Sequence, residues 1–337
     1  MDIIRGIAIF TMVASNLVPY TLAGGSPDWF RFYGTFAAPL FVFLAGMMVR
    51  LTGQLRKRNF GYYAIRGLAV VLVGACIDAF VWGLVPFVSM DVLYLIGLAM
   101  PLCYLLGTFP IMWRYVITIA IFATMLLLQA EAGYRYAPNG FMLQAGLALD
   151  EIISQAELAQ GWLIDGWFPI FPWLGVAFAG YLVGDFRIKY PSFANGKVLL
   201  ATLGSLAIGA WWWQAEPIER FAREGYPDLF YPPTLAFFCI AAGVLSLLFY
   251  IVDRNPQRRI YMPFKLYGKC SLLMYALHVI CISEFFVPLS YQGIKFAFVK
   301  FIWLYLGLMA ILLCVAFGVN KLKPKRLPAA IRFFVGG

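Results

Sequence analysis

The chain has 337 residues but only one histidine, and it carries little charge. Charged residues make up 12% of it and hydrophobic residues 63%. A soluble globular domain has about 25% charged residues, so the composition excludes that class and indicates a membrane protein. The six cysteines show no metal-ligand spacing, and we expect them to fill helix interfaces. No metal is therefore expected.

Other common features are also missing. The first apolar run continues into a loop without an Ala-x-Ala cleavage site, so no cleavable signal peptide is expected. We find no internal repeat, no low-complexity tract and no linker that would separate domains. Residues 1–337 are therefore expected to form a single integral-membrane domain.

Long apolar runs dominate what is present. A helix needs about 20 apolar residues to cross a bilayer. About ten runs meet this length, and they lie near 3–23, 33–52, 62–86, 91–109, 111–130, 168–185, 196–214, 232–252, 267–289 and 297–319. The expected fold class is an all-α polytopic membrane protein with about ten transmembrane helices.

Basic residues predict the orientation of these spans. With the N-terminus in the cytoplasm, all but six of the 26 lysines and arginines fall on the cytoplasmic side or at inner helix ends; the six are Arg31, Arg135, Arg220, Arg223, Lys295 and Lys300. Such a bias is typical of cytoplasmic loops and predicts that both termini are cytoplasmic. The net charge of +10 is thus a topological signature, and no nucleic-acid partner is expected. Short loops and the lack of a targeting signal favour a multi-pass protein of a bacterial inner (cytoplasmic) membrane.

Two longer connections are predicted on the outer side, at 131–167 and 215–231, and both are acidic and flanked by tryptophans. Within the first, residues 141–160 are compatible with a short helix on the membrane surface. Tryptophans near membrane interfaces are usually an aromatic belt. The alternative is an external platform on which a sugar stacks.

His278 is the main candidate functional residue, because it lies inside the apolar run at 267–289. An ionisable side chain at membrane depth is costly and is a functional-site hypothesis by default. Histidine is also the side chain best suited to move protons near neutral pH. The alternative is an interhelical hydrogen bond with a purely structural role.

Six motifs occur in the order of a known family. The chain resembles the catalytic domain of heparan-alpha-glucosaminide N-acetyltransferase and its bacterial relatives, within the wider group of transmembrane acyltransferases. The motifs are Asp-x-x-Arg-Gly at 2–6 with Met-Val-x-x-Asn at 12–16, Pro-Leu-Phe-Val-Phe-Leu-Ala-Gly at 39–46, Asp-Val-Leu-Tyr-Leu-Ile-Gly at 91–97, Phe-Pro-Trp-Leu-Gly at 171–175, Tyr-Pro-Pro-Thr at 231–234 and Gly-Lys-Cys-Ser-Leu-Leu-Met-Tyr-x-x-His at 268–278.

The resemblance implies a transfer from cytoplasmic acetyl-CoA, or another acyl-CoA, to an extracytoplasmic sugar or lipid-linked acceptor. Such a reaction needs cations for the CoA phosphates and a base for the acceptor. The cations expected at the inner helix ends are Arg5, Arg66, Lys265 and Lys269. In a continuous helix, His278 would lie ~13 Å deeper than Lys269. If the first span packs on the ninth, Asn16 can orient the imidazole or donate to an oxyanion.

The chain departs from the family pattern at one point. The family has a histidine in the loop after the first span, and residues 23–29 here contain none. Three outcomes stay open: His278 is the base, Asp28 serves as an outer carboxylate base, or activity has been lost. A silent relative would be a structural subunit of a membrane complex, and a transporter or flippase is the third functional class. Expected partners are membrane lipids and the acceptor, with a homodimer or a larger membrane complex left open.

Overall fold

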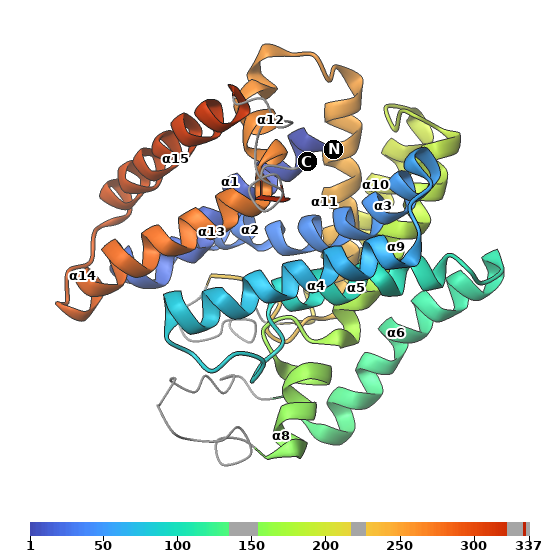
Figure 1. Cartoon of the computed structure of the whole chain (residues 1–337), viewed down its shortest axis with the longest axis horizontal. Helices are drawn as coiled ribbons and strands as arrows, with labels where there is room; N and C mark the ends of the chain where they lie inside the picture. Colours follow the sequence, from blue (N-terminus) through green and yellow to red (C-terminus); the bar gives the residue numbers. More distant parts are fainter. Residues whose placement is uncertain (135–153, 217–226, 322–332, 335–337) are drawn as a thin grey trace. The chain divides into compact units, whose positions relative to one another are not determined.

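We analysed a computed structural model that describes residues 1–134, 154–216, 227–321 and 333–334 (Figure 1). This part of the chain is mainly helical, with an isolated β-bridge between Leu22 and Phe296. The helices are α1 (Asp2–Thr21), α2 (Asp28–Thr35), α3 (Ala37–Arg56), α4 (Phe60–Ile77), η1 (Asp78–Trp82), α5 (Val92–Leu106), α6 (Ile111–Ala132), α8 (Gln155–Gln160), η2 (Gly161–Asp165), α9 (Ile170–Lys189), α10 (Gly196–Trp213), α11 (Leu235–Arg254), η4 (Arg259–Tyr261), α12 (Met262–Lys269), α13 (Ser271–Cys281), η5 (Ile282–Phe286), α14 (Val287–Tyr291) and α15 (Phe298–Lys321).

The described residues contain seven helices that are long and apolar enough to cross a membrane, or eight if a bent pair counts as one span. The seven are Asp2–Thr21, Asp28–Arg56, Phe60–Trp82, Ile111–Ala132, Leu235–Arg254, Ser271–Tyr291 and Phe298–Lys321. The bent pair joins Gln155–Asp165 to Ile170–Lys189 at an angle of 41°. The protein is therefore an all-α polytopic membrane protein, as the composition predicts. The cytoplasmic position of both termini stays a prediction.

Three of the ten expected spans fall outside the set of seven, and one of them, at 168–185, belongs to the bent pair. The runs at 91–109 and 196–214 form α5 and α10, which fall outside the set of seven, and α5 has only 15 residues. The span expected at 267–289 coincides with Ser271–Tyr291, and only its first residues belong to a separate helix. Cys270 has φ −119° and ψ 41°, so α12 ends at Lys269 and α13 begins at Ser271. Most of the surface helix expected at 141–160 lies outside the described residues.

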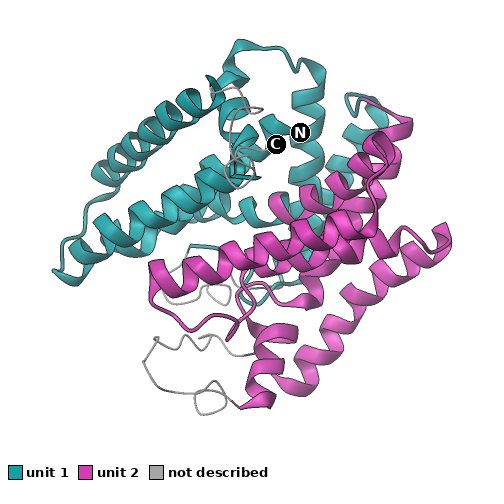
Figure 2. Cartoon of the chain, viewed as in Figure 1, with its two compact units in different colours: residues 1–40, 192–337 teal, residues 41–191 magenta. Residues whose placement is uncertain are grey.

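The chain divides into two compact units (Figure 2). Unit 1 contains residues 1–40 and 192–337, and unit 2 contains residues 41–191. The single domain expected over 1–337 stays a prediction.

In unit 1, helix α1 contacts α2, α11, α12, α13, α14 and α15 (Figure 1). Its closest approach is to α12. A Cβ atom placed on Gly6 would lie 1.8 Å from the Phe264 carbonyl oxygen, and one placed on Gly268 would lie 1.8 Å from the Asp2 carbonyl oxygen. Small residues let helix backbones approach closely in membranes. These two glycines therefore fix where α1 crosses α12.

The other end of α1 is fastened by backbone hydrogen bonds. Phe296 N donates to Thr21 O at 2.7 Å, and Ala23 N donates to Phe296 O at 2.9 Å. Pro19 lies inside the helix and lacks an N–H, so it cannot donate to the carbonyl of Ser15. Helix α1 is thus held at both ends and lacks one backbone hydrogen bond in its last turns.

Close helix contacts at glycines also occur in unit 2. A Cβ on Gly67 of α4 would lie 2.2 Å from the Gly97 carbonyl oxygen of α5. Near one end of α9, Asp185 accepts a hydrogen bond from Arg50 and lies 3.4 Å from the Arg114 guanidinium. Because all three side chains are partly exposed, this ion-pair network contributes modestly to stability.

Candidate functional site

His278 lies on α13 of unit 1 and is fully buried. Its Nδ1 atom is 3.2 Å from the carbonyl oxygen of Met274, one helical turn earlier. A carbonyl oxygen can only accept a hydrogen bond, so Nδ1 must carry the proton. In the neutral ring, Nε2 is then left with a lone pair that accepts.

Asn16 of α1 satisfies that lone pair. Its Nδ2 atom lies 3.0 Å from His278 Nε2. With Nδ1 protonated, the amide donates to Nε2, and the two bonds together select one neutral tautomer of the imidazole. The structure thus brings together Asn16 and His278, which are 262 residues apart in the chain.

The Asn16–His278 bond limits what the imidazole can do at rest. A base needs the Nε2 lone pair, and the Asn16 amide occupies it. Interhelical hydrogen bonds between side chains in membranes contribute only about 0.6–2 kcal/mol. A nucleophile that uses Nε2 as its base would therefore have to displace Asn16, at a cost of this size.

Three of the four predicted cations lie at the crossing of α1 and α12. Arg5 donates to the Asp2 carboxylate at 2.7 Å and to the Gly268 carbonyl oxygen at 3.3 Å. Lys269 is the next residue, and Lys265 precedes it by one turn of α12; both are exposed. Arg5 therefore helps to hold the crossing, whereas the two lysines remain accessible to an anion.

The fourth cation, Arg66, belongs to α4 of unit 2 and is half-buried. Asp28, the alternative base, lies in the first turn of α2. Its side chain is 71% exposed, and it lies 3.6 Å from the Arg31 guanidinium. The functional roles of Arg66 and Asp28 stay predictions.

Sequence reasoning missed Asp228 as a site residue. It lies in the connection between α10 and α11, yet it is buried, and its carboxyl faces Ser15 of α1. Burial raises the pKa of Asp228 to about 7, while the Ser15 hydroxyl and the Arg31 guanidinium oppose that rise. Ser15 is the neighbour of Asn16, so this carboxyl meets the same turn of α1 that holds His278.

A signal for Asp228 was present in the sequence. The three residues that follow it, Leu229, Phe230 and Tyr231, are all apolar or aromatic, and all three are buried. An acid followed by such residues in a polar connection marks a segment that packs onto the protein. That local contrast distinguishes Asp228 from the other acids of the connection.

Unit 2 holds a separate polar group. Asp78 of η1 accepts a hydrogen bond from Tyr94 of α5, and Asp91 caps the N-terminus of α5 by accepting from Val92 N. The Tyr94 ring stacks on Trp162 at a centroid distance of 6.2 Å. Trp162, one of the tryptophans of the predicted aromatic belt, also donates from Nε1 to the Phe87 carbonyl oxygen at 2.7 Å. No group of three or more His, Cys, Asp or Glu side chains suited to a metal ion occurs among the described residues.

Comparison with known proteins identifies the family. No curated protein matches the chain. Residues 1–209 match the family described as heparan-alpha-glucosaminide N-acetyltransferase, catalytic. The match includes Arg5, Asn16, Asp28 and Arg66 and ends before Lys265, Lys269 and His278. Because it covers more than half of the 337 residues, the chain belongs to the heparan-alpha-glucosaminide N-acetyltransferase catalytic family and is a membrane acetyltransferase-like protein.

Proposed function

We propose that the protein transfers an acetyl or similar acyl group from cytoplasmic acyl-CoA to an extracytoplasmic sugar or lipid-linked acceptor. Family membership supports the acetyltransferase class. The observation that carries the proposal is the Asn16–His278 hydrogen bond, because it fixes a neutral imidazole with its proton on Nδ1. An imidazole in this tautomer offers Nε2 as a base.

In the proposed reaction, an amino or hydroxyl group of the acceptor attacks the thioester carbonyl carbon. A new C–N or C–O bond forms while the C–S bond breaks. The proton of the nucleophile passes to His278 Nε2 and then to the departing CoA sulfur, so the imidazole ends neutral. Once displaced from Nε2, the Asn16 amide can donate to the carbonyl oxygen on which negative charge develops.

The basic side chains would bind CoA and take no part in the proton transfer. Lys265 and Lys269 are exposed on α12 and are suited to the phosphates of CoA. Arg5 would act mainly by positioning, because it already binds Asp2 and the Gly268 carbonyl. Arg66 is the fourth proposed cation. This arrangement requires the ends of α12 and α4 to face the cytoplasm of a bacterial inner membrane, as the distribution of basic residues predicts.

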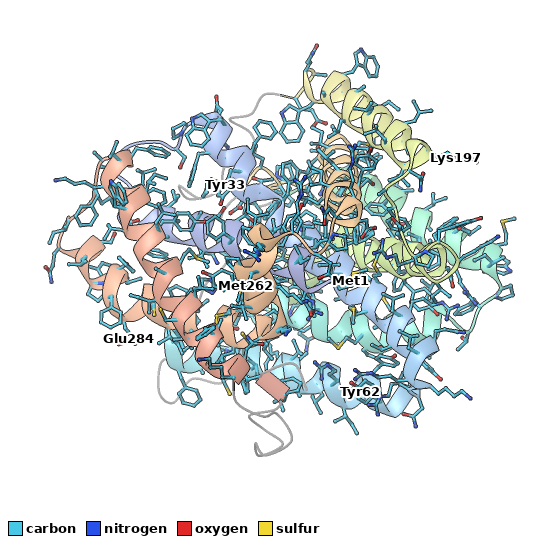
Figure 3. The ribbon with its side chains drawn as sticks, turned by 90° about the horizontal axis from the view of Figure 1, so that it is seen from above. Met1, Tyr33, Tyr62, Lys197, Met262 and Glu284 are labelled. Atoms are coloured by element: carbon cyan, nitrogen blue, oxygen red, sulfur yellow. The ribbon has the colours of Figure 1, made fainter. Side chains whose placement is uncertain are left out.

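The first test measures acetyl-CoA binding by calorimetry on purified protein. The double variant Lys265→Ala/Lys269→Ala should bind about tenfold more weakly, because two charge-assisted contacts are lost. Lys197→Ala is the matched control, since Lys197 is also an exposed lysine of unit 1 near the N-terminus of a helix (labelled in Figure 3). An equal loss of acetyl-CoA affinity in Lys197→Ala would contradict a specific role of the α12 lysines in binding CoA.

The second test measures acyl transfer. His278→Asn keeps a donor for the Met274 carbonyl but cannot take up a proton, so transfer should fall about 10²–10⁴-fold with acetyl-CoA binding retained. Unchanged transfer would remove His278 from the mechanism. Binding without transfer in the unsubstituted protein would favour a silent structural subunit, and no binding at millimolar acetyl-CoA would exclude the enzyme altogether. Substrate export from proteoliposomes without acylation would favour a transporter.

A further inference from the structure

Arg50, Arg114 and Asp185 form a cluster within unit 2 (magenta in Figure 2) in which two cations share one anion. Asp185 Oδ1 accepts a hydrogen bond from Arg50 Nε, and Asp185 Oδ2 lies 3.4 Å from Arg114 Nη1. One carboxylate balances only one of the two guanidiniums, so one positive charge in the cluster is left over. The cluster therefore attracts a further anion.

The Arg50 guanidinium still has donors to offer. Besides its bond to Asp185, it donates from Nη1 to Gln54 Oε1 at 3.2 Å, and its Nη2 group has no hydrogen bond to another described residue. The stem of this side chain packs against α9, because a Cβ on Gly184 would lie 2.8 Å from Arg50 Cβ. A guanidinium with open N–H groups on a packed stem suits the two-point recognition of a phosphate.

Arg114 is fixed by the backbone of the turn between α5 and α6. It donates from Nε to the Phe109 carbonyl oxygen and from Nη2 to the Gly107 carbonyl oxygen, both at 2.8 Å. Gly107 is the C-cap of α5, and a cation is favourable at this end of a helix. Arg114 therefore contributes a fixed positive charge, whereas Arg50 contributes the open donors.

The cluster lies close to three helix ends. Arg50 is six residues before the end of α3, Asp185 is four residues before the end of α9, and Arg114 is the fourth residue of α6. These separations correspond to about 9 Å or less along each helix axis. Lipid headgroups occupy about 5–8 Å on each side of the hydrocarbon core. The depth of the cluster therefore suits contact with a headgroup.

Exposed apolar side chains surround Arg114 on α6. Ile111, Met112, Trp113 and Ile119 are each more than half exposed. A soluble phosphate compound would leave this apolar surface uncovered, whereas the acyl chains of a phospholipid would pack on it. The combination of cations with an exposed apolar surface therefore favours a lipid over a soluble anion.

We propose that Arg50 and Arg114 bind the headgroup phosphate of an anionic phospholipid whose acyl chains lie along α6. The Nη2 group of Arg50 donates to the phosphate, and Arg114 adds charge. Basic pockets between transmembrane helices on the cytoplasmic side, where basic residues predict these helix ends, bind such heads. A zwitterionic lipid fits less well, because its ammonium group would meet two guanidiniums and a carboxylate that already binds both. The inference is independent of the proposed acyl transfer.

The test measures binding to purified, delipidated protein by native mass spectrometry. The separate probes are phosphatidylglycerol, phosphatidylethanolamine, CoA and inorganic phosphate. Phosphatidylglycerol should bind about tenfold more tightly than phosphatidylethanolamine. Arg50→Gln should weaken phosphatidylglycerol binding about tenfold, because a charge-assisted contact is lost. Arg50→Lys keeps the charge without the planar fork, so it should weaken binding by less.

Asp185→Asn distinguishes a binding site from a purely structural ion-pair network. The substitution removes the anion that competes with the phosphate, so the affinity for phosphatidylglycerol should rise about fivefold although both ion pairs are lost. A purely structural network would lose stability in this variant and gain no lipid affinity. Melting temperatures in detergent, recorded with and without phosphatidylglycerol, provide the second readout.

Arg56→Gln is the matched control. Arg56 lies on the same helix as Arg50 and is exposed, so both variants lose the same general attraction to an anionic lipid. Equal losses in Arg50→Gln and Arg56→Gln, or a fall in lipid affinity in Asp185→Asn, would overturn the proposed site. Binding of CoA or inorganic phosphate that requires Arg50, without a preference for phosphatidylglycerol, would overturn the assignment to a lipid.

Discussion

Helices α1 and α6 are both long enough to span a membrane, but they occupy opposite environments. In α1, 56% of the most apolar window is buried inside the protein, whereas in α6 the figure is 11%. The more buried helix is also the less apolar of the two. This is the reverse of a soluble protein, because lipid is as apolar as any core and imposes no requirement for apolar side chains inside.

This difference in burial explains why the polar side chains of the candidate site lie on α1 and not on α6. Helix α1 carries Ser15 and Asn16, which reach Asp228 and His278 from other parts of unit 1. Helix α6 presents exposed apolar side chains such as Ile119 and Leu127. A span that binds protein on most sides can hold polar groups, since neighbouring helices satisfy them.

The largest expected effect is a dependence of stability on pH, caused by the buried carboxyl that packs against α1. Asp228 has a pKa raised from 3.8 to about 7, so the folded state binds its proton more tightly than the unfolded state. The free energy of unfolding should therefore be highest below about pH 4 and should fall as pH rises toward 7, by up to about 4 kcal/mol. Unfolding curves of the protein in detergent, recorded at several pH values, measure this free energy. The same slope in Asp228→Asn would show that another group causes it.

The next effect tests the burial contrast itself. Leu17 of α1 is fully buried and Leu127 of α6 is 68% exposed. Leu17→Ala should cost about 3 kcal/mol of stability through the cavity it leaves, and Leu127→Ala should cost almost nothing. Melting temperatures of the two variants, measured side by side in the same detergent, check this. Similar losses would mean that α6 is covered by a partner.

A smaller effect is expected at the crossing of α1 and α12. Gly6→Ala places a methyl group where the Phe264 carbonyl oxygen lies, so it should destabilise the protein by about 2 kcal/mol. Gly307→Ala on α15 is the control, because a Cβ there meets nothing within 4 Å. Alanine favours the helix at that position, and stability should stay level or rise. If Gly307→Ala lost as much stability as Gly6→Ala, the close contact at Gly6 would not be the cause.

The smallest effect concerns the polar pair on α1. Asn16→Ala removes one interhelical hydrogen bond and should cost about 1 kcal/mol of stability. The substitution should change the hydrogen bonding of His278 Nε2 more than it changes the stability of the fold. NMR of the imidazole nitrogens in labelled protein should show that Nε2 loses its donor. An unaltered Nε2 resonance would contradict the hydrogen bond to Asn16.

The apolar runs predicted the helices well because length and hydropathy depend only on local sequence. Seven of the expected spans coincide with helices able to cross a membrane, and an eighth, at 168–185, is part of the bent pair. The break at Cys270 was not predictable from hydropathy, and its only local signal was Gly268, two residues earlier. The depth expected for His278 relative to Lys269 assumed a continuous helix and stays a prediction.

The site was predicted only in part. An isolated histidine and an isolated amide in apolar runs both indicated a need for hydrogen-bond partners, and the structure pairs Asn16 with His278. The contact of Asp228 with Ser15 depends on how the connection between α10 and α11 folds back onto α2. The buried residues 229–231 indicate that this segment packs onto the protein, but which helix it meets depends on tertiary contacts between distant segments.

The crossing of α1 and α12 also restricts how the protein can evolve. At both Gly6 and Gly268, the atom that an added side chain would strike belongs to the opposing backbone. A compensating substitution can shrink a side chain but cannot remove a main-chain oxygen. Relatives that keep this crossing must therefore keep glycine at both positions. This constraint links residue 6 to residue 268, far beyond the end of the family match at residue 209.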